Sequence, residues 1–346
     1  MSSGDRLFFA SDYMEGAHPR ILQRLMETNM VSSVGYGLDE FSESARNRIR
    51  KACSAPEADV FFLVGGTQTN AVMIDAILRP WQGVMAAETG HISTHEAGAI
   101  EFGGHKVLTL PQMDGKVSAE DVAACIRTYW QDENHDHVVM PGMLYISQPT
   151  EYGTLYSLEE LRKISGVCRE NGIPLYLDGA RLAYALACPE NDVTLPDIAA
   201  LCDAFYIGGT KCGALFGEAA VIPRHGYLPH LFTIIKQHGA LMAKGRLLGI
   251  QFDTLFQDNL YLEISRNAVR EARRIREALL QKGYELYIDS PTNQIFTIVT
   301  KEKAKALREK VLYGFMEELG DGRLVIRFCT SWASRPEDVD ELISIL

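Results

Sequence analysis

Between residues 59 and 222 of this chain, short apolar runs alternate with longer segments of helical periodicity. The apolar runs lie at residues 59–64, 84–86, 106–110, 143–147, 175–178, 204–207 and 218–222. Such an alternation is typical of parallel strands that are joined by helical crossovers. We therefore predict an α/β fold with a mostly parallel seven-stranded sheet and helices on both faces. In sheets of this kind the functional site lies beyond the carboxyl ends of the strands.

After about residue 250 the alternation stops. A long helical stripe covers residues 260–281, and expected strands follow at residues 285–288, 294–300 and 324–328. This order predicts a smaller α+β domain. We expect a large domain at residues 15–250 and a small domain at residues 251–346, and the N-terminal segment 1–14 is expected to belong to the small domain. We also expect a short helix near residues 94–99, and a capping box of Ser334 and Glu337 at the start of the last helix.

The composition restricts the partners and the location of the protein. The formal net charge is −11, so the chain offers no basic surface to a nucleic acid or an anionic membrane. The seven cysteines are scattered and form no C-x-x-C pair, which favours reduced thiols over disulfides or a zinc site. The sequence shows no signal peptide and no apolar run of membrane-spanning length. We expect a cytoplasmic protein that acts on a small molecule.

A lysine stands on a glycine-rich turn after one of the buried runs. Lys211 follows the strand at residues 204–207 and the two glycines after it. In isolation it could be a solvated loop lysine, but Asp178 ends another buried run 33 positions earlier, about one strand–helix–strand unit. A carboxylate and a lysine at neighbouring strand ends suit pyridoxal phosphate, with the carboxylate at the pyridinium nitrogen and the lysine as the Schiff base. We predict this cofactor.

The turn at residues 65–68 opens a helix directly after a strand. Exposed N–H groups and the helix dipole make such a turn a seat for phosphate, although an ordinary tight turn has the same composition. His91 also lies just past a strand end, where it could stack on a flat cofactor, move a proton, or serve only as a structural histidine. His95 is four residues further on, as in a helical metal pair, but no third ligand is evident, and we predict no metal site.

Two arginines are candidates for binding a substrate carboxylate, because a guanidinium group matches a carboxylate in geometry. Arg327 ends the apolar strand of the small domain, where it could also form a surface salt bridge. Arg181 stands three residues after Asp178, where it could serve the cofactor, the substrate carboxylate or both.

Taken together, these motifs resemble those of the low-specificity threonine aldolases, which have the aspartate-aminotransferase-like fold of pyridoxal-phosphate enzymes. The resemblance covers nearly the whole chain in order. The matching residues are Ser11-Asp12, Gly66-Thr67-Gln68 with Asn70, His91-Ile92 with Glu96-Ala97-Gly98, Leu177-Asp178-Gly179-Ala180-Arg181, Lys211-Cys212-Gly213-Ala214, and Ile326-Arg327-Phe328 with Trp332 and Asp338-Val339-Asp340.

The resemblance implies a role for each part of the cofactor site. Lys211 would hold the cofactor as an imine, Asp178 would pair with its ring nitrogen, and His91 would stack on the ring. Gly66 and Thr67 would bind the phosphate group.

The resemblance also implies how the substrate is held and how subunits assemble. Ser11, Arg181 and Arg327 would hold the substrate carboxylate. Lys244 lies near the position at which the family sends a basic residue into the phosphate site of a neighbouring subunit. A homodimer or homotetramer is therefore expected.

One position departs from the family pattern. The family commonly has E-N-T-H-N-G where this chain has Gln148-Pro149-Thr150-Glu151-Tyr152-Gly153, so Glu151 replaces a histidine that helps to hold the β-hydroxyl of the substrate. The resemblance therefore leaves the erythro/threo preference open, and the general base could be His91, Glu151 or a water molecule.

The resulting prediction is a lyase that cleaves L-threonine or L-allo-threonine into glycine and an aldehyde. Another pyridoxal-phosphate reaction, such as β-elimination, transamination or racemisation, is the alternative enzyme, because a fold does not determine a reaction. A cofactor-binding protein without turnover is the alternative from another class. The presence of Lys211, Asp178 and Arg327 argues against it.

Overall fold

The computed structural model describes residues 6–346 and contains a seven-stranded sheet with the strand order β2-β8-β7-β6-β5-β3-β4. Strands β3 to β7 run parallel to one another, and β8 is antiparallel to both β7 and β2. The mostly parallel sheet is therefore confirmed. The strands are β2 (Asp59–Leu63), β3 (Gln82–Ala87), β4 (Val107–Leu110), β5 (Met140–Ser147), β6 (Leu175–Asp178), β7 (Ala204–Gly208) and β8 (Glu218–Ile222).

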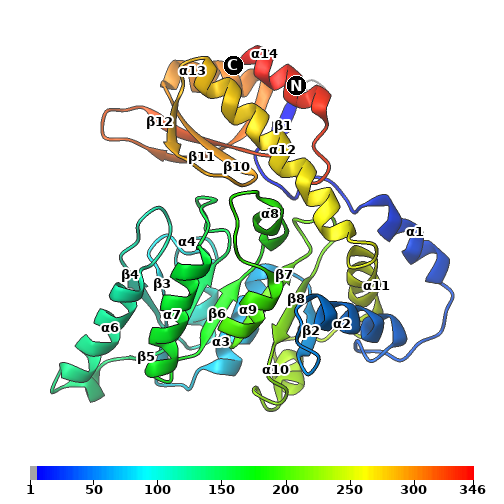
Figure 1. Ribbon diagram of the computed structural model, residues 1–346, viewed down its shortest axis with the longest axis vertical. Coiled ribbons are helices and arrows are strands. Elements are labelled where there is room, and N and C mark those ends of the chain that lie inside the picture. Colours follow the sequence, from blue (N-terminus) through cyan, green and yellow to red (C-terminus); the bar gives the residue numbers. More distant parts are fainter. Residues whose placement is uncertain (1–5) are drawn as a thin grey trace.

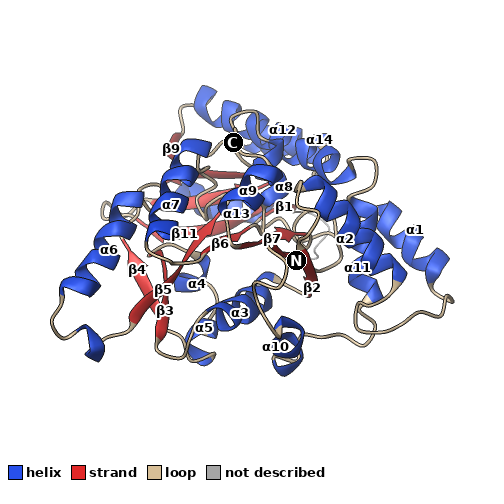
Figure 2. Cartoon of the chain, turned by 60° about the horizontal axis from the view of Figure 1, so that its bottom comes forward, coloured by secondary structure: helices blue, strands red, loops and turns tan. Residues whose placement is uncertain are grey.

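Helices cover both faces of this sheet, as Figure 2 shows. One face carries α3 (Gly66–Ile77), α4 (His91–Thr94), α5 (Ala99–Phe102) and α10 (Leu231–Gln237). The other face carries α1 (Pro19–Thr28), α2 (Glu40–Ala52), α6 (Ala119–Gln131), α7 (Leu158–Glu170), α8 (Leu182–Ala187), α9 (Leu195–Leu201) and α11 (Arg246–Leu255). None of the helices within residues 6–346 is long and apolar enough to cross a lipid bilayer.

A second, five-stranded sheet lies above the first in Figure 1 and has the order β1-β11-β12-β10-β9. Its strands are β1 (Leu7–Phe9), β9 (Glu285–Ile288), β10 (Gln294–Val299), β11 (Val311–Glu318) and β12 (Leu324–Cys329). Its helices are α12 (Leu260–Gln281), α13 (Lys301–Lys310) and α14 (Pro336–Ile345). The expected domain boundary at residues 250 and 251 falls inside α11, and the division of the chain into 15–250 and 251–346 stays a prediction.

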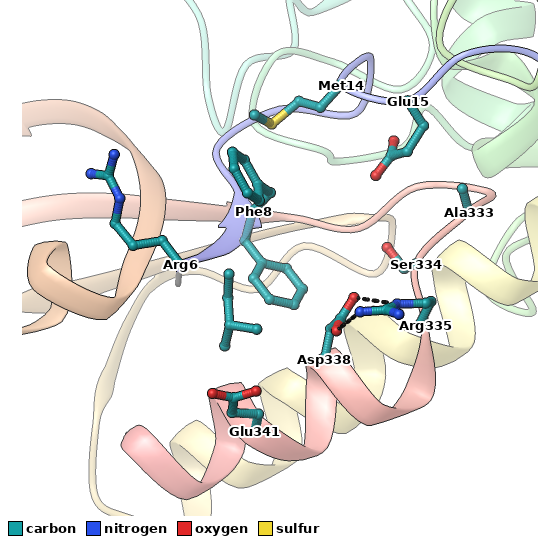
Figure 3. Close-up of a pocket in the computed structure, with 11 residues that line it drawn as sticks. Arg6, Phe8, Met14, Glu15, Ala333, Ser334, Arg335, Asp338 and Glu341 are labelled. Atoms are coloured by element: carbon teal, nitrogen blue, oxygen red, sulfur yellow. Dashed lines mark hydrogen bonds and ion pairs between the residues drawn. The ribbon is translucent and has the colours of Figure 1, made fainter. Parts of the chain in front are cut away.

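The N-terminal segment joins the small sheet through a short strand that the sequence does not reveal. Strand β1 runs parallel to β11 over three residue pairs, from Leu7 opposite Val311 to Phe9 opposite Tyr313. Both strands lack a clear apolar alternation, so only their long-range pairing defines them. Between β1 and α14 lies a groove of about 760 Å³, in which Arg335 is paired with Asp338 (Figure 3).

Two local expectations are wrong. Helix α14 begins at Pro336 with Arg335 as its N-cap, and the Ser334 hydroxyl instead accepts a hydrogen bond from the Ser331 N–H. The helix therefore starts one residue too late for the predicted capping box. The helix expected at residues 94–99 is instead divided into α4 and α5, because Ala97 and Gly98 adopt positive φ angles of 53° and 72°.

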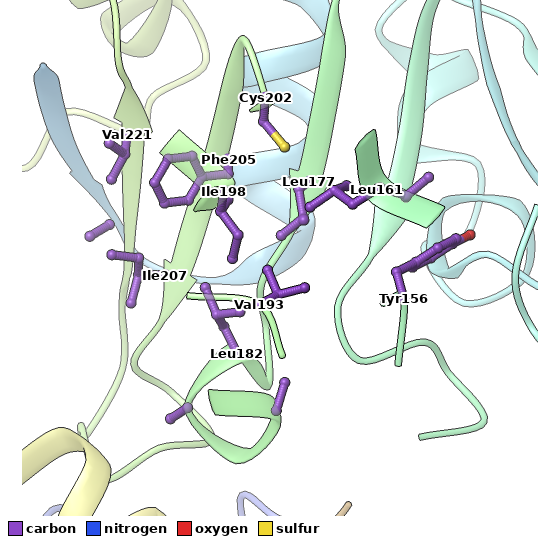
Figure 4. Packing of buried hydrophobic residues seen from close by; sticks show 14 of the residues in the cluster. Tyr156, Leu161, Leu177, Leu182, Val193, Ile198, Cys202, Phe205, Ile207 and Val221 are labelled. Carbon is purple, nitrogen blue, oxygen red and sulfur yellow. The ribbon is translucent and has the colours of Figure 1, made fainter. Parts of the chain in front are cut away.

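Strand alternation decides which face each buried side chain occupies. Leu177, Phe205 and Ile207 pack toward α7, α8 and α9, as shown in Figure 4. Their sequence neighbours Tyr176 and Tyr206 point to the opposite face, toward α3. Asp178 is two residues after Tyr176, so its carboxylate also faces α3, at the carboxyl end of β6.

Candidate active site

Most of the predicted site residues line one cavity of about 400 Å³ at the carboxyl ends of β5, β6 and β7. They are Gly66, Thr67, His91, Glu151, Asp178, Arg181 and Lys211. The same cavity is also lined by Tyr13, His95, Ser147, Pro149, Ala180, Tyr206, Thr210 and Glu218. The larger groove of Figure 3 contains none of the predicted residues.

Asp178 is held as an anion at the centre of this cavity. Its side chain is buried, with 4% of the residue exposed. One oxygen accepts hydrogen bonds from Tyr206 Oη at 2.5 Å and the Ala180 N–H at 2.9 Å, and the other accepts from Tyr145 Oη at 2.7 Å and Asn70 Nδ2 at 3.0 Å. Burial alone would raise the pKa of Asp178, but the charge of His91 and these hydrogen bonds outweigh burial and lower that pKa.

A chain of hydrogen bonds connects Asp178 to His91. Asn70 Nδ2 also donates to Glu96 Oε1 at 2.7 Å, and the same oxygen lies 2.7 Å from His91 Nδ1. Tyr176 Oη donates to Asn70 Oδ1 at 3.0 Å and so determines the orientation of the amide. The buried Glu96 carboxylate thereby orients the His91 ring at the wall of the cavity.

Lys211 lies on the tight turn between β7 and β8. The backbone N–H groups of Gly209 and Thr210 both donate to Gly217 O, at 2.9 and 3.0 Å. A Cβ atom on Gly208 would lie 2.3 Å from Ala180 O, so the close approach of the two strand ends requires glycine. Burial and the charge of Arg181 lower the pKa of the Lys211 amine, and this favours the uncharged, nucleophilic form.

Arg181 is already engaged by a carboxylate from the N-terminal segment. Its Nε and Nη2 atoms donate to the two oxygens of Asp12 at 2.6 and 3.0 Å, and Asn293 Nδ2 donates to Asp12 Oδ2 at 2.9 Å. Burial would raise the pKa of Asp12, but the charges of Arg181 and Lys211, together with the hydrogen bonds from Arg181 and Asn293, outweigh burial and lower the pKa to about 2. Ser11, the neighbour of Asp12, is not among the residues that line the cavity, and its predicted role stays a prediction.

Arg327 lies on β12 of the small sheet and is not among the residues that line the cavity, but it retains an uncommitted donor. Its Nη1 donates to Gln294 Oε1 at 2.9 Å and its Nη2 donates to Ala10 O at 3.1 Å. Within residues 6–346, the buried atoms Arg327 Nε and Gln294 Nε2 have no hydrogen-bond partner. Two buried donors of this kind suit a carboxylate ligand.

Glu151 lies half-buried at the wall of the cavity. Its Oε1 atom accepts hydrogen bonds from the His91 N–H at 2.9 Å and from Ser147 Oγ at 2.7 Å. Burial raises the pKa of this carboxyl group against the effect of the Ser147 hydrogen bond. Lys244, in contrast, lines a separate cavity with Leu25, Val31 and Arg246.

Several site residues were not assigned a role from the sequence. Tyr145 and Tyr206 donate to Asp178 from strands whose apolar character predicts only core packing. The sequence signal that could have found them is strand alternation, because it places both tyrosines on the face of Asp178. Glu218 is the first residue of the strand predicted at residues 218–222, and strand alternation gives no indication that it belongs to the site.

Comparisons with known proteins agree with this geometry. Residues 9–302 match the profile of a family described as beta-eliminating lyase. The chain belongs to the beta-eliminating lyase family. It is 31% identical to the low-specificity L-threonine aldolase of Pseudomonas aeruginosa over 340 residues, which cover 96% of this chain and 95% of that protein.

Solved structures extend the comparison. The threonine aldolase of Leishmania major is 43% identical and superposes with a TM-score of 0.95 over 98% of each chain. An aspartate aminotransferase from Thermus thermophilus is 15% identical, with a TM-score of 0.74 over 99% of this chain and 91% of the other, and shows the shared fold alone. The predicted family resemblance and the aminotransferase-like fold are confirmed.

The residues of the cavity fit pyridoxal phosphate, the cofactor of this family. An ionised carboxylate, Asp178, and an amine with a lowered pKa, Lys211, line one cavity. The N-terminus of α3 at Gly66 and Thr67 opens onto the same space and supplies N–H groups of the kind that bind phosphate.

Proposed function

We propose that this protein is a pyridoxal-phosphate-dependent aldolase that cleaves the Cα–Cβ bond of L-threonine or L-allo-threonine to give glycine and acetaldehyde. The convergence of the half-buried Lys211 amine and the buried, ionised Asp178 in one cavity carries this proposal. The relatives named threonine aldolase support the choice of this reaction within the family. When bound, the cofactor supplies an electron sink for the bond that breaks.

Three residues would hold the ring of the cofactor in this proposal. Lys211 would supply the amine for covalent attachment. Asp178 would face the ring nitrogen and keep it protonated, since neutral donors from Asn70, Tyr145 and Tyr206 preserve its negative charge. The flat His91 ring, oriented by Glu96, would cover one face of the cofactor.

The substrate carboxylate would bind to Arg327. Its Nε atom and the nearby Gln294 Nε2 are buried donors without partners in the described residues, and an ionic ligand would satisfy both. Arg181 would contribute charge from its pair with Asp12, and that pair would also order the N-terminal segment that carries Ser11.

The β-hydroxyl group must lose its proton as the Cα–Cβ bond breaks and the aldehyde carbonyl forms. We infer that Glu151 takes this proton. It lines the cavity, its raised pKa lies closer to the range in which a general base works, and one of its oxygens is fixed by two donors. His91 is already bonded through Nδ1 to Glu96, and this favours a positioning role for its ring.

The active unit would be a homodimer or a homotetramer. Large apolar side chains are exposed on α1 and the segment after it, including Met26 at 80% and Met30 at 89% exposure, and a second subunit would cover them. Lys244 lies beside this segment, in a position to reach a neighbouring subunit.

The seven cysteines are free, which is consistent with a reducing, cytoplasmic location.

A product assay tests the proposed function. Purified protein loaded with pyridoxal phosphate is supplied separately with L-threonine, L-allo-threonine, L-serine and phenylserine. Release of acetaldehyde together with glycine from threonine or allo-threonine is the expected result. Release of 2-oxobutyrate and ammonia from threonine, or of pyruvate and ammonia from serine, would instead indicate β-elimination. A change of optical rotation without cleavage would indicate racemisation.

A further inference from the structure

The cavity contains one buried carboxyl group to which the proposed reaction assigns no role. Glu218 is the first residue of β8, and 3% of it is exposed. In the sheet register it stands opposite Leu63, the last residue of β2, and opposite Gly208, the last residue of β7. It therefore lies between the two turns that the cofactor would use, the turn that opens α3 and the turn that carries Lys211.

The contacts of Glu218 hold its side chain in the cavity wall. Its Oε2 atom accepts a hydrogen bond from the Gly209 N–H at 3.0 Å. Thr210, whose hydroxyl accepts from the Gly217 N–H at 2.9 Å, can donate its own hydroxyl proton to the same carboxyl group. Burial raises the pKa of Glu218 to about 8, against the lowering effects of Thr210 and Lys211.

Among the described residues, the titratable groups that act on Glu218 are one amine, Lys211, and otherwise an anion and neutral groups. Strand β6 presents Asp178, whose lowered pKa keeps it anionic, together with Tyr176. Tyr206 from β7 and Tyr261 from α12 are neutral phenols, because burial raises the pKa of each well above its usual value. The turn presents Cys212, a buried thiol, and Lys211, the amine that the cofactor would engage.

We propose that Glu218 is held as a neutral carboxylic acid that donates a hydrogen bond to the phosphate group of the cofactor. This inference rests on the proposed function. A phosphate dianion offers only acceptor oxygens, and an ionised glutamate also only accepts, so the two would repel each other. The protonated acid has one O–H donor, and Glu218 lines the same cavity as Gly66 and Thr67, whose N–H groups would bind the phosphate.

The proposal makes phosphate binding depend on pH. Deprotonation of Glu218 in the free protein would place a negative charge beside the phosphate site, in addition to that of Asp178. Binding of the phosphate dianion would in turn raise the pKa of Glu218. With a pKa of about 8 in the free protein, linkage gives a loss of about tenfold in phosphate-dependent affinity near pH 9.

The test measures ligand binding, not turnover. The probe is 4-deoxypyridoxine 5′-phosphate, which has no aldehyde and so cannot react with Lys211, and the control ligand is unphosphorylated 4-deoxypyridoxine. Isothermal titration compares the wild-type protein, freed of cofactor, with Glu218→Gln and Glu218→Leu from about pH 7 to about pH 9.5. Circular dichroism checks that each variant is folded.

Glu218→Gln keeps the shape and a neutral donor, so its affinity for the phosphate ester near pH 7 should stay within a few-fold of wild type. The ratio of wild-type to variant affinity should then fall about tenfold by about pH 9, for the phosphate ester alone. Glu218→Leu, which has no donor, should bind the ester more weakly than Glu218→Gln at every pH.

Three outcomes would overturn the inference. Parallel pH profiles of wild type and Glu218→Gln would show that Glu218 does not titrate beside the phosphate. A Glu218→Gln protein that binds the ester more than tenfold more weakly near pH 7 would show that the ionised form is the one that acts. If neither ligand binds any of the proteins, the proposed function fails, and the inference fails with it.

Discussion

Replacing Asp178 by asparagine tests the centre of the proposed site with almost no change of shape. The two carboxylate oxygens accept four hydrogen bonds, from Tyr206, Ala180, Tyr145 and Asn70, at distances between 2.5 and 3.0 Å. An asparagine side chain has an NH₂ group in place of one oxygen, so two of these donors would face another donor. The substitution also removes the negative charge that would pair with the ring nitrogen of the cofactor.

The size of the effect follows from the loss of one partner of a buried ion pair. Such a loss costs about 3–5 kcal/mol. At roughly 1.4 kcal/mol for each decade in rate, kcat for threonine cleavage should fall by about two to three and a half decades. The fall should appear in kcat and not only in KM, because the ring needs its protonated nitrogen most when the Cα–Cβ bond breaks.

The assay follows acetaldehyde release from L-threonine at saturating pyridoxal phosphate, with the bound cofactor measured by its absorbance. Asp253→Asn is the matched control. Asp253 is a buried carboxylate on α11 that binds Arg48 and Ser44, both at 2.6 Å, outside the cavity. The Asp253→Asn variant should lose stability and keep kcat within a few-fold of the wild-type value. A near-wild-type rate for Asp178→Asn would refute the assigned cofactor geometry, and an equal loss in both variants would show that the assay reports folding.

Three further predictions concern other parts of the site. Lys211→Ala should lose turnover by several orders of magnitude, because the nucleophile is removed. Borohydride reduction of the wild-type protein, followed by peptide mapping, should find the cofactor on Lys211. A map that places the cofactor on Lys244 would contradict the assignment. Glu151→Gln should lower kcat for threonine by about 10²–10⁴ while the exchange of the glycine α-proton survives, and loss of both activities together would indicate a structural role for Glu151. If Lys244 completes the phosphate site of a neighbouring subunit, Lys244→Ala should weaken cofactor binding. Dilution of the wild-type protein to monomers should then abolish activity. A fully active monomer, shown by light scattering at the assay concentration, would exclude a shared site.

The sequence is informative about the site where the residues stand at strand ends. Lys211 and Asp178 each follow a short apolar run, and the carboxyl ends of parallel strands meet at one edge of a sheet. Gly66 and Thr67 open a helix at the same edge. These positions could be predicted because local patterns define both the strands and their direction.

Other features depend on contacts between distant parts of the chain. The Arg181 side chain pairs with Asp12 across 169 residues, so the sequence shows a free arginine where the structure shows an engaged one. The strand β1 exists only because it pairs with β11, which is about 300 residues away in the chain. The predicted capping box at Ser334 failed because the position of Pro336 decided where the helix begins.

The amino-acid sequence by itself determined the fold class, the family and the positions of Lys211, Asp178 and His91, because apolar periodicity and short motifs are local properties of the chain. Only the tertiary structure decided the ionisation of the site. It buried Asp178 among four donors and lowered its pKa, and it buried Glu218 beside a single backbone N–H and raised its pKa to about 8. The physical reason is that the charge of a buried carboxyl group depends on its three-dimensional surroundings, and residues from several distant strands and helices provide them.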